Sequence, residues 1–270
     1  MTAATSAGGT GTPHVPQRAV LLRGLDILDC FDSRQPVLGV TTIAARTGLP
    51  PATVYRLLTT LREWGAVERV DRGRYRLGLK LWRLGSAAPQ VRQLRDAALP
   101  FLEDLYEATH AVVHLAVRDG HDTLYIEKIS GRGAVPVASC VGRRLPLHAT
   151  GPGKVLLAYG PPGVFDDLVA AGLDRLACGT ITDPGELRRT LAAIRTTGHA
   201  VSRQEASDST ASVAAPVFGP TGTAVASISV VTPLGTFTPL AFVPAVRAVA
   251  RAVSRALDAP GRSTEKFSAQ

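Results

Sequence analysis

The sequence predicts an α+β protein made of two folded blocks. Residues 18–78 have the spacing of three helices followed by a hairpin, whereas residues 91–258 combine β-type runs with helical segments. The blocks also differ in charge, because residues 1–85 hold 12 Lys and Arg against 6 Asp and Glu, and residues 86–270 hold 18 against 16. A basic first block beside a nearly neutral second block indicates an anionic partner for the first block alone. The 270 residues suffice for two domains, and 45% apolar composition supplies a core for each.

Three helices are predicted at the start of the first block. A helix over residues 18–31 carries five apolar residues on one face: Val20, Leu21, Leu25, Leu28 and Phe31. A shorter helix over 41–47 ends at Gly48, since glycine is favoured where a helix terminates. A third helix follows Pro50-Pro51, because proline is tolerated in the first helical turn. The segment Gly48-Leu49-Pro50 has the length and composition of the turn in a helix-turn-helix unit.

The third helix has one apolar side and one polar side. Val54, Leu57, Leu58 and Leu61 follow the i, i+3, i+4, i+7 pattern and predict a buried stripe. The remaining surface is rich in hydroxyl groups and is basic near its N-terminal half, and such side chains can lie against base edges and phosphates in a DNA major groove. The candidate DNA contacts on this helix are Thr53, Tyr55, Arg56, Thr59 and Thr60.

A basic hairpin follows the third helix. Residues 67–70 and 74–77 flank the turn Asp71-Arg72-Gly73, so Arg72 and Arg74 lie at its tip. A basic hairpin beside a groove-reading helix is a wing, whose arginines would lie near phosphate or in the minor groove. Trp64 and Tyr75 are expected to pack the hairpin onto the helices. Together with the local positive charge, these elements predict a winged helix-turn-helix that binds duplex DNA.

The second block predicts a domain of alternating helices and strands. Residues 79–90 are expected to form a linker helix that breaks near Gly85 to Pro89. Strands are predicted at 111–118, 123–129, 134–139, 213–218 and 225–231. Helices are predicted at 91–109, 151–159, 163–171, 184–197 and 240–257. The compositions of residues 1–17 and 259–270 predict a disordered arm and a disordered tail.

Several functional classes are disfavoured by the sequence. Cys30, Cys140 and Cys178 are three in number and far apart, which argues against a disulfide framework or a zinc ribbon. The first residues lack the basic and apolar regions of a secretory signal, and no membrane-length apolar stretch occurs, so we expect a cytoplasmic, nucleoid-associated protein without membrane contact. No catalytic or metal-ligand spacing is recognisable, so neither catalysis nor a cofactor is expected.

Two further motifs were weighed. Residues 151–154, GPGK, lack the leading glycine and the Ser/Thr of a phosphate-binding loop, and predict a glycine-rich helix N-terminus whose amides would favour an acidic ligand. Lys154 is expected to be a solvated side chain, with an ion pair to that ligand as the alternative, and His148 is expected to be structural.

One face of the last predicted helix carries Arg247, Arg251 and Arg255. We interpret it as a solvated face, because the opposite face carries Val246, Val249 and Val253.

The chain resembles the bacterial IclR family of transcriptional regulators. The likeness covers about residues 18–258 and is carried by the helix-turn-helix, by GRYRLG in the hairpin, by RLPLHATGPGK, and by AAPVF further along. The resemblance implies a winged helix-turn-helix joined by a linker helix to a mixed α/β, GAF-like domain that binds a small metabolite. It also implies homodimers or tetramers that act on partly palindromic operators as repressors or activators, without enzymatic activity.

The same resemblance assigns an effector pocket by position. The implied residues are Leu145, Gly151, Pro152, Ser202, Ser212, Ser229 and Val231. In the pocket, this chain departs from the family pattern at Ser202 and Arg203, where an acidic residue is usual, and at Ser212, where cysteine is frequent. In the third helix it departs at Ala52, where serine is frequent. The departures in the pocket change its polarity and charge, so the identity of the family's ligand does not carry over. The predicted partners are an operator and a small-molecule effector, for which the glycine-rich helix N-terminus favours an acid. The alternatives are an architectural DNA binder and an enzyme with an appended DNA-binding segment.

Overall fold

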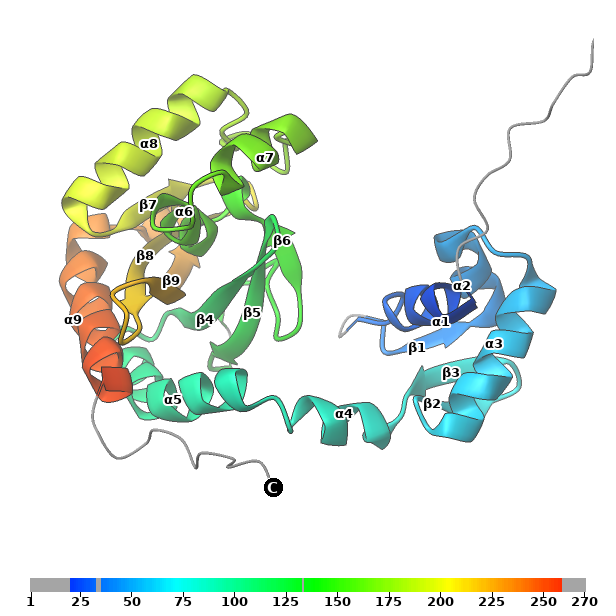
Figure 1. Ribbon diagram of the computed structural model, residues 1–270. Helices are drawn as coiled ribbons and strands as arrows, with labels where there is room; N and C mark the ends of the chain where they lie inside the picture. The colour runs from blue at the N-terminus through cyan, green and yellow to red at the C-terminus, as the bar shows by residue number, and fades with distance from the viewer. Residues whose placement is uncertain (1–19, 33–34, 133, 259–270) are drawn as a thin grey trace, which may run out of the picture. The chain divides into compact units, whose positions relative to one another are not determined.

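The computed structural model describes residues 20–32, 35–132 and 134–258, and divides into two compact units, Met1–Gly85 and Ser86–Gln270. Figure 1 labels the elements in chain order. The predicted arm at 1–17 and the predicted tail at 259–270 lie outside the described residues. Each unit has its own core, and the α+β fold class is confirmed.

Among its described residues, the first unit has three helices and a small antiparallel sheet, followed at its end by a fourth helix, α4 (Leu79–Gly85). The three helices are α1 (Val20–Leu28), α2 (Val40–Thr47) and α3 (Pro51–Trp64). Its strands, in the order β1-β3-β2, are β1 (Val37–Gly39), β3 (Arg74–Leu77) and β2 (Val67–Asp71). The predicted hairpin is therefore present, and it gains a third strand from the segment before α2.

The helix-turn-helix forms as its sequence predicts. Gly48 ends α2 with φ of 69°, a left-handed conformation that glycine adopts without steric cost. Proline occupies the first turn of α3, and Val54, Leu57 and Leu58 are buried against the other helices. The stripe predicted for α3 is confirmed, and its opposite side is left for another molecule.

The prediction for the apolar face of α1 was right in part. Phe31 is buried and Leu28 packs against the same core, whereas Val20 is 59% exposed and Leu21 is 72% exposed, and Gly24 and Ile27 are the buried residues within the helix. Apolar residues occupy more than half of the helix circumference, so local spacing does not identify which of them meet α2 and α3. Trp64 also differs from the prediction, since it is 47% exposed and lies under the Lys80 ammonium at 4.0 Å, while Tyr75 is buried as expected.

The second unit begins after a break between two helices. Helix α4 (Leu79–Gly85) ends where the glycine was expected to interrupt it, and α5 (Pro89–Thr109) follows. The sheet has six antiparallel strands in the order β6-β5-β4-β9-β8-β7. Its strands are β4 (Val112–Asp119), β5 (Asp122–Ile129), β6 (Arg144–Pro146), β7 (Ala200–Arg203), β8 (Thr210–Phe218) and β9 (Ala224–Pro233).

Helices cover both faces of the central strands. Helices α5 and α9 (Pro239–Asp258) pack on one face, and α6 (Gly151–Ala158) and α8 (Pro184–Thr197) pack on the other, while α7 (Val164–Ala171) adds to the second cluster (Figure 1). Strand β8 is therefore buried along almost its whole length. On α9 the valines at 246 and 253 are buried, whereas Arg251 and Arg255 are exposed, in agreement with a solvated basic face.

The strand predicted at 134–139 does not form. Those residues run as an irregular segment, and Val137, Ala138 and Ser139 line a cavity instead of joining the sheet. Strands β6 and β7 were not predicted because each has only three or four residues at a sheet edge, too few for an alternating pattern. Among the described residues, no helix is long and apolar enough to cross a membrane, and no cluster of three His, Cys, Asp or Glu side chains is suited to a metal ion.

Candidate functional site

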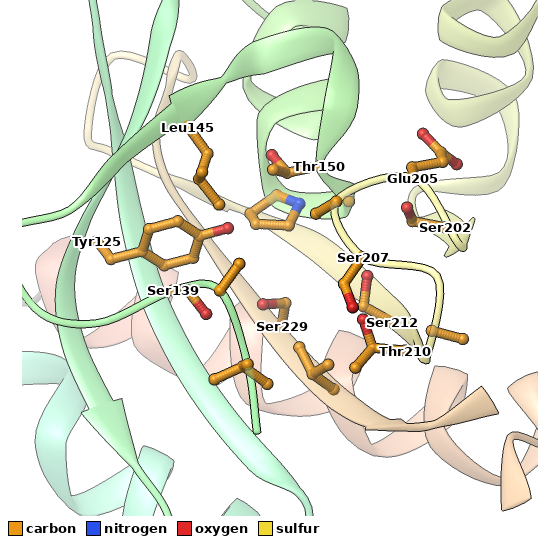
Figure 2. Close-up of a pocket in the computed structure, with 17 residues that line it drawn as sticks. Tyr125, Ser139, Leu145, Thr150, Ser202, Glu205, Ser207, Thr210, Ser212 and Ser229 are labelled. Atoms are coloured by element: carbon orange, nitrogen blue, oxygen red, sulfur yellow. The ribbon is translucent and has the colours of Figure 1, made fainter. Parts of the chain in front are cut away.

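A cavity of about 440 Å³, open volume at its mouth included, lies between the sheet of the second unit and the start of α6 (Figure 2). One side is formed by β5 and β6, the other by β7, β8 and β9, and the segments at 137–139 and 205–207 complete it. Seventeen residues line it, and all seven positions assigned to an effector pocket in the sequence are among them: Leu145, Gly151, Pro152, Ser202, Ser212, Ser229 and Val231.

Strand register brings several of these residues together. Ser202 of β7 pairs with Ser212 of β8, and Ser212 pairs with Val231 of β9, so the three form one row across the sheet. Ser229 lies two residues from Val231 on the same face of β9, and its cross-strand partner on β4 is His114. Residues far apart in the chain therefore share one wall.

The N-terminus of α6 forms another wall. A Cβ atom at Gly151 would come within 2.7 Å of Ser212 Oγ, so glycine lets the helix start directly against the serines of the sheet. Thr150 caps the helix, because its Oγ1 accepts a hydrogen bond from the Gly153 amide at 3.0 Å. His148 is structural as predicted, with Nε2 at 2.9 Å from the Asp174 carbonyl oxygen.

Lys154 and Glu205 form a buried ion pair, which the sequence did not predict. Lys154 is 1% exposed and Glu205 is 6% exposed, and the Lys154 ammonium donates to Glu205 Oε1. The expectation of a solvated Lys154 was wrong, because α6 is buried on all sides and a buried ammonium requires a counter-charge. Glu205 is among the residues that line the cavity, and its Oε2 atom is buried without a partner among the described residues.

The geometry gives little support to an acidic ligand at α6. The Gly153 amide is bonded to Thr150 Oγ1, the Lys154 amide is bonded to the Thr150 carbonyl, and Pro152 has no N–H. The Lys154 ammonium is held by Glu205. Of the groups that the sequence offered to an anion, the Gly153 and Lys154 amides and the Lys154 ammonium are thus engaged within the protein, and the Gly151 amide is the one for which no partner is found among the described residues.

A buried histidine lies behind the cavity. His114 is fully buried on β4, its Nε2 lies 2.9 Å from Ser139 Oγ, and its ring meets Tyr125 edge-on with centroids 5.0 Å apart. Burial, with a smaller contribution from the Lys128 charge, lowers the pKa of His114 to about 3. The ring is therefore neutral at pH 7 and holds Ser139 at the cavity wall. The pKa of Tyr125 is raised by burial, so its hydroxyl also stays neutral.

His114 is expected to make stability depend on pH. Below pH 6.5, the ordinary pKa of histidine, the unfolded chain binds a proton that folded His114 does not bind until about pH 3. This contribution to the free energy of unfolding is complete above pH 6.5 and is lost toward pH 3, at up to about 1.4 kcal/mol per unit. In urea unfolding followed by circular dichroism, His114→Gln should flatten the decline between pH 6.5 and 4.5. Equal slopes in both proteins would contradict this prediction.

The predicted DNA contacts lie on the outer side of α3. Tyr55, Arg56 and Thr60 are exposed, and Thr53 and Thr59 are half-buried. The Thr59 hydroxyl donates to the Tyr55 carbonyl at 3.0 Å, which leaves its oxygen lone pairs available as acceptors. All five residues are thus on or beside one surface of the first unit, and α3 has the dimensions of a helix that enters a major groove.

The wing arginines differ in their surroundings. Arg72 is exposed at the tip, whereas Arg74 hydrogen-bonds to Asp71, with Nε at 3.0 Å from Asp71 Oδ1. This hydrogen bond raises the pKa of Arg74 and lowers the pKa of Asp71. Arg76 is similarly paired with Glu68 at 2.7 Å. Arg72 therefore presents the less compensated charge.

The wing is expected to contribute to the salt dependence of DNA binding. Arg72→Ala should lower the slope of log affinity against log salt by about 0.9, the value for one lost phosphate contact. Arg74→Ala should lower it less, because Asp71 already offsets that charge. Fluorescence anisotropy with duplex DNA over a salt series measures both slopes. An unchanged slope in Arg72→Ala would place the wing outside the interface.

The two units define a class of protein: DNA-binding regulators in which a winged helix-turn-helix is joined to a domain with a cavity lined by polar side chains. Residues 20–71 match the IclR helix-turn-helix domain, and residues 87–255 match the C-terminal domain of the bacterial transcriptional regulator IclR. The chain belongs to the IclR family of transcriptional regulators, which are not enzymes.

Named relatives agree with this family. The chain is 34% identical to the transcriptional regulator XynR of Escherichia coli over 78% of this chain and 84% of the relative. It is 30% identical to the transcriptional repressor IclR of Escherichia coli, over 84% of each chain. It is also similar to the crystal structure of an IclR homologue from Microbacterium hydrocarbonoxydans complexed with 4-hydroxybenzoate, with a TM-score of 0.81 and 29% identity over 88% of this chain and 99% of that one.

Proposed function

We propose that the protein is an effector-controlled regulator that binds a partly palindromic operator and changes its operator affinity when a small metabolite enters the cavity of the second unit. The observation that supports this best is the cavity itself, whose lining includes all seven residues assigned to effector binding. An architectural DNA binder would have no use for such a cavity. The contacts proposed with DNA are Thr53, Tyr55, Arg56, Thr59, Thr60, Arg72 and Arg74.

The active form is proposed to be a homodimer or a tetramer. Two recognition helices related by a two-fold axis read the two halves of a palindrome. Helix α1 supports this proposal, because Val20, Leu21, Leu22 and Leu25 are all exposed, from 46% to 72%. An exposed apolar surface of this kind is typical of a protein interface. Sedimentation of the purified chain with and without DNA distinguishes dimer from tetramer.

The metabolite acts through thermodynamic linkage. A ligand that binds one arrangement of the DNA-binding units more tightly than another changes the affinity of the protein for the operator. The operator must change the affinity for the ligand by the same factor, because the coupling is reciprocal. A coupling free energy of about 1–3 kcal/mol corresponds to a change of roughly 5- to 150-fold. The sequence favours an acidic ligand, and the similar homologue is complexed with an acid, 4-hydroxybenzoate. Effector control requires only that a ligand enter the cavity, whatever the charge of that ligand.

The test compares ligand response with DNA binding in the same protein. Ser202→Ala and Ser212→Ala should change the concentration of effector that alters operator binding, while the affinity of the ligand-free protein for the operator stays within about twofold. The operator is sought in the DNA upstream of the protein's own gene by anisotropy at low salt. Loss of folding in both variants, seen by circular dichroism, would make these serines core residues and would contradict the proposed site.

A further inference from the structure

Hydroxyl groups dominate the polar lining of the cavity. Eight of the lining side chains carry one: Tyr125, Ser139, Thr150, Ser202, Ser207, Thr210, Ser212 and Ser229 (Figure 2). Glu205 is the only charged side chain among the described lining residues. A hydroxyl both donates and accepts, so this lining suits a ligand with several groups of the same kind.

Two of the lining residues each have a buried side-chain oxygen without a hydrogen-bond partner among the described residues. Ser229 is fully buried, and its Oγ has no hydrogen-bond partner among the described residues. Glu205 Oε2 is likewise unpartnered, although Oε1 is bonded to Lys154. An ionised carboxylate only accepts hydrogen bonds, so the group that satisfies Oε2 must be a donor. Unsatisfied buried polar atoms carry a desolvation cost that a ligand hydroxyl removes.

The charge of the lining disfavours a ligand carboxylate. The only lining charge is negative, and the nearby Lys154 ammonium is already bonded to Glu205 Oε1. The Lys154–Glu205 pair is neutral as a whole, so the cavity offers a ligand carboxylate no unpaired cationic side chain to offset its desolvation. An uncharged donor does not carry the desolvation cost of a charge.

The rest of the lining provides apolar surface for a carbon skeleton. Val137, Leu145 and Val231 contribute aliphatic side chains, and Figure 2 shows the Tyr125 ring at the side of the cavity. Polyols and monosaccharides combine C–H surface with many hydroxyls, and aromatic and aliphatic walls accommodate that C–H surface.

We propose that the cavity binds an uncharged polyhydroxylated molecule, a polyol or a monosaccharide, with one hydroxyl donating to Glu205 Oε2 and another paired with Ser229. This inference rests on the proposed function, because it names the class of effector that the second unit takes. The shared chemistry of polyols and sugars is several adjacent hydroxyls on a short carbon skeleton without an ionised group.

The test is isothermal titration of the full chain, without DNA, against matched probes. The neutral probes are glycerol, xylitol, sorbitol, ribose, xylose and glucose, and the acidic probes are glycerate, xylonate and gluconate. At least one neutral probe should bind with a dissociation constant below about 1 mM, and its acid at least about tenfold more weakly. Binding of glycerol, xylitol or sorbitol would identify a polyol as the ligand, and binding of ribose, xylose or glucose would identify a monosaccharide. Tighter binding of the acids, or no binding by any neutral probe, would overturn the proposal.

Two residues of β9 with a hydroxyl side chain, Ser229 and Thr232, provide a matched pair of variants. Ser229 and Thr232 both have a buried hydroxyl without a partner among the described residues, but only Ser229 lines the cavity. Ser229→Ala should weaken binding of the best neutral probe about two- to thirteenfold, the usual effect of one hydrogen bond. Thr232→Val should leave affinity unchanged, and melting curves establish that both variants fold. Equal affinities for Ser229→Ala and the unaltered protein would overturn the assigned contact.

Parallel anisotropy measurements separate this inference from the proposed function. If a neutral probe binds the protein but the affinity for the operator stays constant, the proposed control by an effector is contradicted and the proposed ligand class is supported. If the protein binds the operator and only the acids change that affinity, control by an effector is supported and the proposed ligand class is wrong.

Discussion

Lys154→Met is expected to destabilise the second unit by about 3–5 kcal/mol. The substitution removes one partner of a buried ion pair and leaves the Glu205 carboxylate uncompensated, with only 6% of that residue exposed. Both tryptophans, Trp64 and Trp82, belong to the first unit, so their fluorescence does not report this event. Urea unfolding followed by circular dichroism, together with scanning calorimetry, measures the loss.

The control is the double variant Lys154→Met/Glu205→Met. Replacing both partners by apolar side chains of similar size removes the uncompensated charge, so the double variant should recover much of the stability lost in the single variant. The melting transition of the first unit should be the same in all three proteins. A single variant as stable as the unaltered protein would show that water reaches Glu205 and compensates its charge.

Arg56→Ala is expected to weaken specific operator binding by about 1–3 kcal/mol, roughly 5- to 150-fold, if the guanidinium contacts a base. Arg56 is exposed on the outer side of α3, at a position suited to a base edge in the major groove. Anisotropy with operator DNA and with a scrambled duplex measures the two losses separately. A smaller loss on the scrambled duplex assigns Arg56 to sequence reading.

Arg62 provides a matched control on the same helix. It is also exposed, but it lies in the last turn of α3, away from the N-terminal half. Arg62→Ala should reduce affinity for both duplexes by a similar, small factor, since a lysine or arginine near phosphate acts without regard to sequence. If Arg56→Ala also lowers both affinities equally, Arg56 contacts phosphate and does not read bases.

Local patterns predicted the DNA-binding unit well. The stripe on α3 depends on residues three and four apart, and the turn at Gly48 depends on one residue that accepts positive φ, so both are encoded within a few positions. The same reasoning placed the buried face of α1 only in part. Its apolar residues cover more than half of the helix circumference, and only the positions of α2 and α3 determine that Ile27 is buried and Leu21 is exposed.

The cavity was less accessible to sequence reasoning. Its seven assigned positions came from family resemblance, and no local pattern brings Ser202, Ser212 and Ser229 together, because strand register does so. Glu205 was missed entirely. A signal existed in the segment GPGKVLLA, where a lysine in an otherwise apolar helix requires a counter-charge, but the sequence does not say which acidic residue supplies it.

The sequence by itself determined the family, the α+β class, the basic first unit and the polar side of its third helix, since periodicity, charge and motif are properties of neighbouring residues. Only the tertiary structure decided which side of α1 is buried, that Lys154 pairs with a carboxylate 51 residues away, and that hydroxyls line the cavity. The reason is physical: burial and ion pairing depend on which distant segments the folded chain brings into contact.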